Sequence, residues 1–448
     1  MPQPAEIDLT ALIERQRIGW FRISILLWSC AVMAVEGYDM QLAGFAAPAI
    51  IKAWKIDKTL LTPVFGFGLF GYMLGATLLS SLADRFGRKK IIQGGVFWFG
   101  ALTLAAASSH SIAELTILRF LAGLGLGAAI PTTIALAVEY APSRIRATTV
   151  GILFIGYNIG GALGGLVAAK LMPTLGWPSV FYIGGISPIL LSLTLIFVLP
   201  ESISFLALRR SESRDLAAVA ARLDPELKLE PAARFLMREE KQSGAPAKHL
   251  FTEGRAMITL LLWVAYISVL MAQHFLTSWL PTLLVSSGLS LSDSVLAGSS
   301  VAIGAAIGGL TLCWLIDRQG IVALVSSFAV VALLIVLLPY TTRSDFLLMP
   351  LAFLIGFGLV GGLTGLNGLS GTLYPTYIRS TGVGAAFGVG RIGSILGPVL
   401  GGLLISLNPS NSLLFTCAAV PVLCCSGALY LFTRLAAASS TREATVLS

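Results

Sequence analysis

The feature that most constrains the fold is a series of apolar runs of about 20 residues, the length of a helix that crosses the hydrocarbon core of a bilayer. Only 12 % of the 448 residues are charged, whereas a soluble domain has roughly 25 %. Spanning segments must satisfy their own backbone hydrogen bonds, and long runs without alternation favour helices over a barrel. The sequence therefore predicts an all-α membrane protein with twelve transmembrane helices, at 22–47, 60–82, 91–109, 113–138, 148–170, 177–199, 256–280, 293–315, 321–340, 346–370, 382–405 and 412–434.

A hydrophilic stretch divides these helices into two sets of six. We predict an N-terminal half at 1–199, a cytoplasmic central loop at 200–255 with a short amphipathic helix at Leu216–Leu223, and a C-terminal half at 256–448. Most Lys and Arg residues lie in alternate loops, and such loops remain in the cytoplasm. This distribution predicts a multi-pass protein of the bacterial inner membrane with both termini cytoplasmic, despite three lysines in the first opposite loop: Lys52, Lys55 and Lys58.

The sequence repeats itself at a constant, ungapped offset of 233 residues: Leu82–Gly87 (LADRFG) meets Leu315–Gly320 (LIDRQG). Other matches at this offset are Gly71 with Gly304, Gly75 with Gly308, Pro142 with Pro375, Phe154 with Phe387, Gly160 with Gly393 and Gly164 with Gly397. Chance does not maintain one offset over so many positions. We therefore predict two six-helix halves in parallel orientation, with a substrate site between them.

Four charged residues within the spans occur in one half only: Glu36, Asp39, Arg119 and Arg391. Their counterparts in the other half are Val269, Ala272, Ala352 and Asn158, in that order. Ionisable side chains are costly inside a membrane and are functional candidates by default. The i, i+3 spacing puts Glu36 and Asp39 on one helix face, at a depth similar to that of Arg119. We expect these three residues to form a cluster that couples transport to protons; the alternative is a purely structural ion pair.

Arg391 lies near the middle of its span, where an unpaired charge needs a partner. A guanidinium binds a carboxylate in a bidentate manner, so Arg391 is predicted to bind an anionic substrate; the alternative is an ion pair that locks the two halves together. Further predicted substrate contacts are Tyr38, Asn158, Gln273 and His274, although a lone histidine is usually a packing residue. Aromatic side chains that could face an aromatic ligand are Tyr38, Tyr157, Phe275 and Trp279.

The loop around Asp84 is predicted to act in gating. Its acidic, basic and glycine residues recur at Asp317, Arg318 and Gly320, a symmetry that a merely solvated loop does not need. Charges at such a turn can bind helix ends across the bundle in one state and release them in another. The predicted gating residues are Asp84, Arg85, Gly87, Arg88, Glu139, Arg146, Asp317, Arg318 and Arg379.

Motifs for catalysis or cofactor binding are not found in the sequence. It has no Gly-x-Ser-x-Gly motif, no phosphate-binding loop and no His/Cys set with metal-ligand spacing. The five cysteines lie in or beside apolar runs and suggest no disulfide framework. We therefore expect neither an enzyme nor a cofactor or metal site, and transport driven by an ion gradient.

The segment Leu82–Lys89 (LADRFGRK) resembles the signature of the major facilitator superfamily, although Ser80 stands where that signature usually has glycine. Several segments also resemble the aromatic acid:proton symporter family, which takes up benzoate-type acids. That family usually has Asp-Gly-Tyr/Phe-Asp in the first helix, and here the first carboxylate is Glu36. The segments that carry the resemblance are Leu118–Gly127, Glu139–Pro142, Leu199–Ser202, Trp279–Thr282, Tyr374–Gly384 and Gly388–Ser394.

The resemblance and the one-sided charges together lead us to expect proton-coupled uptake of a hydroxybenzoate-like aromatic carboxylate by alternating access. The expected partners are this substrate, protons and the lipid bilayer, with no nucleic acid, and we expect a monomer. The alternatives are a carrier of another organic acid or a sugar, a drug exporter, and a membrane sensor or enzyme. A sugar site needs many amide and hydroxyl groups, and a sensor or enzyme needs a sizeable soluble domain.

Overall fold

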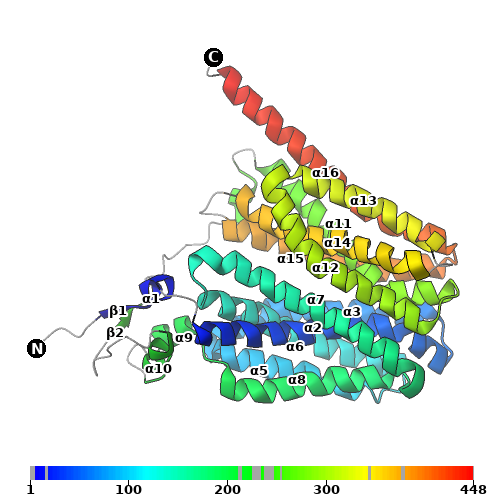
Figure 1. The fold of residues 1–448 in the computed structure, drawn as a ribbon, viewed down its shortest axis with the longest axis horizontal. Coiled ribbons are helices and arrows are strands. Elements are labelled where there is room, and N and C mark those ends of the chain that lie inside the picture. The colour runs from blue at the N-terminus through cyan, green and yellow to red at the C-terminus, as the bar shows by residue number, and fades with distance from the viewer. Residues whose placement is uncertain are drawn as a thin grey trace, which may run out of the picture.

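The computed structural model describes residues 6–15, 19–209, 214–223, 234–236, 247–252, 255–341, 345–374 and 379–446. The long helices of the first half are α2 (Trp20–Trp54), α3 (Thr62–Leu74), α5 (Arg88–Ala106), α6 (Ile112–Glu139), α7 (Arg146–Leu175) and α8 (Pro178–Val198). Those of the second half are α11 (Ala256–Ser286), α12 (Leu291–Gln319), α13 (Val322–Leu337), α14 (Asp345–Leu373), α15 (Arg379–Ser406) and α16 (Asn411–Val446) (Figure 1). The predicted all-α architecture is confirmed.

Eleven helical segments within the described residues are long and apolar enough to cross a membrane. The second, Lys58–Phe86, is composite: a π-helical turn at Gly75–Leu79 and a 3₁₀ turn at Ser80–Leu82 connect α3 to α4 (Ala83–Phe86). The twelfth helix of the fold is α5, which begins with three basic residues and packs between α6 and α8.

Short elements gather at the end of the bundle where α2 begins. They are α1 (Leu9–Arg15), α9 (Ile203–Arg209), α10 (Arg214–Leu223) and two parallel strands, β1 (Glu6–Asp8) and β2 (Arg234–Leu236). The predicted amphipathic helix is α10, whose Leu216, Ala220 and Leu223 are buried in one cluster with Leu9 and Ile13. This end of the N-terminal half is therefore covered by α1 and by part of the central segment.

The internal repeat reappears as repeated helix contacts. A Cβ on Gly160 would lie 1.8 Å from the carbonyl oxygen of Ala34, and a Cβ on Gly393, its repeat mate, would lie 2.0 Å from that of Ile267, the mate of Ala34. Only glycine permits such a close approach of two helix backbones. Three further contacts recur at the same offset: Gly71 on Phe120 with Gly304 on Phe353, Gly75 on Leu124 with Gly308 on Phe357, and Gly164 on Tyr38 with Gly397 on Met271.

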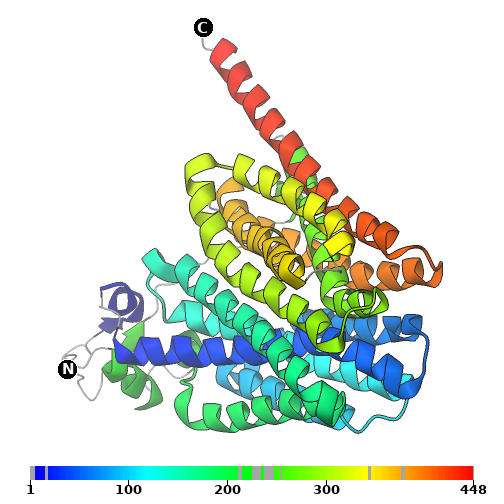
Figure 2. The same ribbon diagram turned by 45° about the vertical axis from the view of Figure 1, so that its right-hand side comes forward.

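The two halves are in close contact at the end of the bundle opposite α9 and α10. There α2 packs on α11 at Gly44 and Thr277, α7 on α12 at Gly165 and Ser299, and α3 on α15 at Gly66 and Val399. The rings of Phe65 in α3 and Trp279 in α11 also meet edge to face. Toward the opposite end of the bundle, where α2 begins, the helices of the two halves diverge (Figure 2). The molecule therefore has one tightly closed end.

Candidate functional site

A cavity of about 240 Å³ lies between the two halves. It is lined by α2, α3, α6 and α7 from the first half and by α11, α14 and α15 from the second. Its wall is mainly apolar and aromatic, a composition typical of small-molecule sites. The polar side chains that reach it are Glu36, Tyr72, Tyr157, Asn158, Gln273, His274, Thr364, Asn367 and Arg391.

Arg391 enters the cavity between two aromatic rings. Its guanidinium carbon lies 4.5 Å from the ring centroid of Tyr72 and 4.8 Å from that of Phe387, and Nη2 donates a 3.3 Å hydrogen bond to the Tyr72 hydroxyl. The ion pairs found among the described residues do not involve Arg391. The rings stabilise the cation through their π faces, while its remaining donors stay available to an anion.

Glu36 lies in the same cavity and is 97 % buried, since only 3 % of its surface is exposed. The Tyr72 hydroxyl also hydrogen-bonds to this carboxyl group, so Tyr72 lies between Glu36 and Arg391. Oε2 of Glu36 has no hydrogen-bond partner among the described residues. A buried carboxyl oxygen without a partner is costly and is a place where a proton can bind.

Asp39 and Arg119 form a separate buried pair. Nη1 of Arg119 donates to Oδ1 of Asp39 at 2.9 Å, and the Thr103 hydroxyl donates to the same oxygen at 2.8 Å. The predicted pairing of Arg119 with a first-helix carboxylate is thus found for Asp39. Glu36 instead faces the cavity, because residues three apart differ by about 60° around a helix, enough to send one side chain to α5 and α6 and the other to the interface.

His274 lies between this pair and the cavity. It lines the cavity and also a smaller pocket of about 30 Å³ that contains Arg119. Its Nδ1 lies 3.0 Å from the Leu270 carbonyl oxygen, which can only accept, so Nδ1 carries the proton and Nε2 is an acceptor in the neutral ring. His274 therefore lies between the cavity that contains Glu36 and the pocket that contains Arg119, the partner of Asp39.

The family model of the Major Facilitator Superfamily matches residues 29–398. The chain belongs to this superfamily. It is 36 % identical to a gallate transporter of Pseudomonas putida, over 94 % of each chain, and 33 % identical to a 4-hydroxybenzoate transporter of Acinetobacter baylyi, over 98 % of this chain and 97 % of the other.

The same fold is found in solved structures. A solved bacterial homologue of the lysosomal transporter Spinster, in an inward-facing and occupied conformation, superposes with a TM-score of 0.70 at 16 % identity, covering 93 % of this chain and 98 % of the other. This superfamily member is therefore a multi-pass membrane protein and a secondary transporter, and not an enzyme. The predicted family is confirmed.

Three predicted aromatic contacts lie elsewhere in the transporter. The Tyr38 hydroxyl donates to the Val180 carbonyl at 2.9 Å, and its ring packs on Gly164. Nε1 of Trp279 donates to the Pro398 carbonyl at 3.0 Å, and the ring of Phe275 packs on Gly401. These three side chains do not line the cavity, because glycines on the neighbouring helices leave space that their rings fill.

Asn158, Gln273, His274 and Tyr157 line the cavity, and their contact with a ligand stays a prediction. The sequence interpretation missed Tyr72 and the aromatic pair Phe154 and Phe387. These two phenylalanines coincide in the repeat, so a search for residues present in one half only does not find them. Both members of six pairs of equivalent repeat positions line the cavity, whether or not the residues are identical: Met40/Gln273, Ile130/Leu363, Pro131/Thr364, Ile134/Asn367, Phe154/Phe387 and Asn158/Arg391.

The predicted gating residues Arg88 and Glu139 form an ion pair between α5 and α6. The Ser202 hydroxyl donates to Glu139 at 2.7 Å, and the Lys89 backbone N–H donates to Glu201 at 3.0 Å. Gly87, at φ 98°, lets the Glu201 carboxylate approach. Glu201, which the prediction had not included, therefore belongs to this network, which connects the first half to the start of the central segment.

The other predicted gating residues make fewer contacts. Asp84 and Arg85 are exposed, and the Arg85 guanidinium lies over the Phe86 ring. Arg318 lies over the Trp314 ring at 4.2 Å, and Nε of Arg146 donates to the Ala141 carbonyl at 3.3 Å. The side chains of Asp317 and Arg379 lie outside the described part of the chain, and the gating role stays a prediction.

Proposed function

We propose that the protein carries a small aromatic carboxylate, of the hydroxybenzoate type, into the cell together with protons. The observation that carries the proposal is Arg391, a cation held between two aromatic rings in the cavity, with no ion pair to a carboxylate among the described residues. A guanidinium matches the geometry of a carboxylate. The names of the relatives, a gallate and a 4-hydroxybenzoate transporter, support the same substrate class.

The cavity suits a flat ring that carries polar substituents. Tyr72, Phe154, Tyr157 and Phe387 offer aromatic surfaces for stacking or edge contacts. Asn158 donates Nδ2 to the Phe154 carbonyl at 2.9 Å, so its side-chain oxygen remains an acceptor for a ring hydroxyl. Oε1 of Gln273 is buried without a partner among the described residues and can accept a second one. The wall is otherwise mainly apolar and aromatic and contains a guanidinium, which favours an aromatic acid over a sugar.

Proton coupling is proposed to centre on Glu36. When a substrate carboxylate binds Arg391, it enters a cavity that already holds Glu36, and two neighbouring carboxylates cannot readily both stay ionised. Protonation of Glu36 removes this repulsion, so substrate and proton bind together. Asp39, held by Arg119 and Thr103, is proposed as a second proton site or a relay, with His274 between it and the cavity.

Transport is proposed to proceed by alternating access of the two halves. The closed end is built by α2 on α11 and α7 on α12, and the Arg88–Glu139 network is proposed to release and re-form as the other end closes and opens. From the loop charges, we place the end that contains the Arg88–Glu139 network, and both termini, on the cytoplasmic side of a bacterial inner membrane. The protein is proposed to act as a monomer with halves at 1–199 and 256–448.

The proposal is tested by uptake of labelled 4-hydroxybenzoate in cells that express the protein, with and without a proton uncoupler. We expect concentrative uptake that the uncoupler abolishes and that unlabelled gallate or benzoate competes. Cells carrying Arg391→Ala are the matched control, because the protein keeps its fold but lacks the proposed anchor. Accumulation that persists with the uncoupler would exclude proton symport, and uptake of sugars with no effect of aromatic acids would exclude the substrate class.

A further inference from the structure

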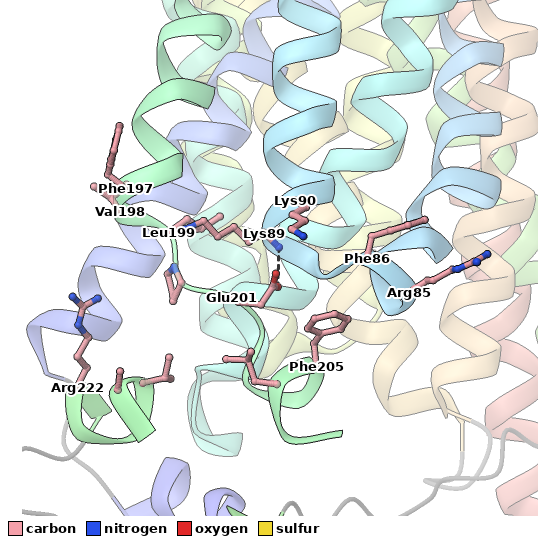
Figure 3. Close-up of a pocket in the computed structure, with 14 residues that line it drawn as sticks. Arg85, Phe86, Lys89, Lys90, Phe197, Val198, Leu199, Glu201, Phe205 and Arg222 are labelled. Atoms are coloured by element: carbon pink, nitrogen blue, oxygen red, sulfur yellow. Dashed lines mark hydrogen bonds between the residues drawn. The ribbon is translucent and has the colours of Figure 1, made fainter. Parts of the chain in front are cut away.

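A cavity of about 660 Å³ lies outside the transport site. It is formed where α4, α5 and α8 end against α9, α10 and the Leu199–Glu201 segment, at the edge of the membrane-spanning region (Figure 3). Its walls belong to the first half and the central segment. The proposed substrate and proton sites lie outside this cavity.

The cavity has an excess of positive charge. Four cationic side chains line it, Arg85, Lys89, Lys90 and Arg222, against the single carboxylate of Glu201. This carboxylate already accepts from the backbone N–H groups of Lys89, at 3.0 Å, and Ser202, at 2.8 Å. Its charge is therefore partly compensated by peptide dipoles, and the cations retain an unbalanced field.

Figure 3 shows how these cations are arranged. Lys89 and Lys90 lie together above Glu201, Arg222 rises from α10 on the far side beneath the end of α8, and Arg85 points away from the others. Nζ of Lys89 donates to the Ile196 carbonyl at 2.7 Å, whereas Lys90 and Arg222 are exposed. Lys90 and Arg222 are thus the two cations best placed to bind an added anion.

An apolar stripe leads from the cavity along the outer face of α8. Phe197, which lines the cavity, is 86 % exposed, and exposed apolar side chains continue from it at helical spacing. The stripe consists of Ile186, Leu190, Leu193 and Phe197. Spacing of i, i+4, i+7 and i+11 places these side chains on one helix face, where acyl chains can lie against them.

We propose that this cavity binds the headgroup of an anionic phospholipid, with the positive charges of Lys90 and Arg222 attracting its phosphate and an acyl chain following the α8 stripe. Basic pockets beside spanning helices bind such headgroups. The stripe favours a lipid over a free phosphate ion, because a soluble anion gains nothing from it. The bound lipid connects α5 and α8 to α10 and so holds the central segment against the first half.

The test is native mass spectrometry of the purified, delipidated protein with phosphatidylglycerol, with phosphatidylcholine of the same acyl chains, and with inorganic phosphate as a competitor. We expect preferential binding of phosphatidylglycerol, weakened about fivefold for each cation removed in Lys90→Gln and Arg222→Gln. Arg434→Gln is the matched control, because Arg434 is an exposed cation whose hydrogen bonds within the described part of the chain go to Tyr430 in its own helix, at 2.9 and 2.7 Å.

The outcomes separate the possible ligands. Equal binding of the two lipids, or unchanged binding by the double variant Lys90→Gln/Arg222→Gln, would overturn the proposal. Displacement of phosphatidylglycerol by millimolar inorganic phosphate would assign the cavity to a soluble anion instead. Size-exclusion profiles and thermal unfolding of all variants check that these exposed substitutions leave the fold intact.

Discussion

Arg391 supplies the most informative single perturbation. Arg391→Ala removes a guanidinium that reaches a buried cavity and has no carboxylate partner among the described residues. A bound carboxylate would receive two charge-assisted hydrogen bonds from it, each worth about 1.5–3 kcal/mol, and truncation of one partner of a buried pair costs about 2–5 kcal/mol. We therefore expect 4-hydroxybenzoate to bind roughly 10²- to 10³-fold more weakly.

The assay is equilibrium binding of labelled 4-hydroxybenzoate to purified protein. Arg391→Lys keeps the charge but loses the bidentate fork, so we expect a loss of roughly tenfold, about one hydrogen bond. Tyr38→Phe is the control, because its hydroxyl donates to Val180 away from the cavity, and it should leave the affinity unchanged. Wild-type affinity in Arg391→Ala protein that is correctly folded would refute the assignment of the substrate anchor.

Three further variants test the remaining parts of the mechanism. Asp39→Asn should lower the free energy of unfolding by about 3–5 kcal/mol, because it leaves Arg119 buried without its ion-pair partner. The unfolding temperature should fall in this variant and partly recover in Asp39→Asn/Arg119→Gln, and an unchanged unfolding temperature in Asp39→Asn would contradict this. Gly160→Ala should greatly reduce the yield of folded protein, because its Cβ would lie 1.8 Å from the Ala34 carbonyl oxygen, whereas Gly151→Ala, with open space around it, should not; equal yields would show that α2 and α7 are not this close. Glu36→Gln should retain substrate exchange across vesicle membranes but lose gradient-driven accumulation, and normal accumulation would remove Glu36 from the coupling role.

The helices and their duplication were predictable because both leave signals over long stretches of sequence: bilayer thickness sets the length of each apolar run, and the repeat keeps one offset over many positions. Individual side-chain directions depend on neighbours that the sequence does not order in space. Glu36 and Asp39 are three residues apart, and only the positions of α5 and α6 decide that Asp39 bonds to Thr103 and Arg119 while Glu36 enters the cavity. Glu201 was missed for the same reason, since its contact with α5 is made across 112 residues.

The repeat was useful for the charges and misleading for the aromatic residues. Arg391 stood out because its mate is Asn158, and both line the cavity. Phe154 and Phe387 are mates, so the search for residues present in one half only did not select them, yet they also line it. A site on the pseudo-symmetry axis between two similar halves uses shared positions from both of them, so identity between mates does not exclude a residue from the site.

The central claim is that substrate and protons cross together, and it is tested most directly by substrate-induced proton movement. Purified protein is reconstituted into vesicles containing a pH-sensitive dye, with the membrane potential clamped, and 4-hydroxybenzoate is added outside. We predict that the lumen becomes more acidic as the acid enters, after correction for the permeation seen in vesicles with Arg391→Ala protein. Entry of labelled substrate without a matching change in lumenal pH would contradict the account.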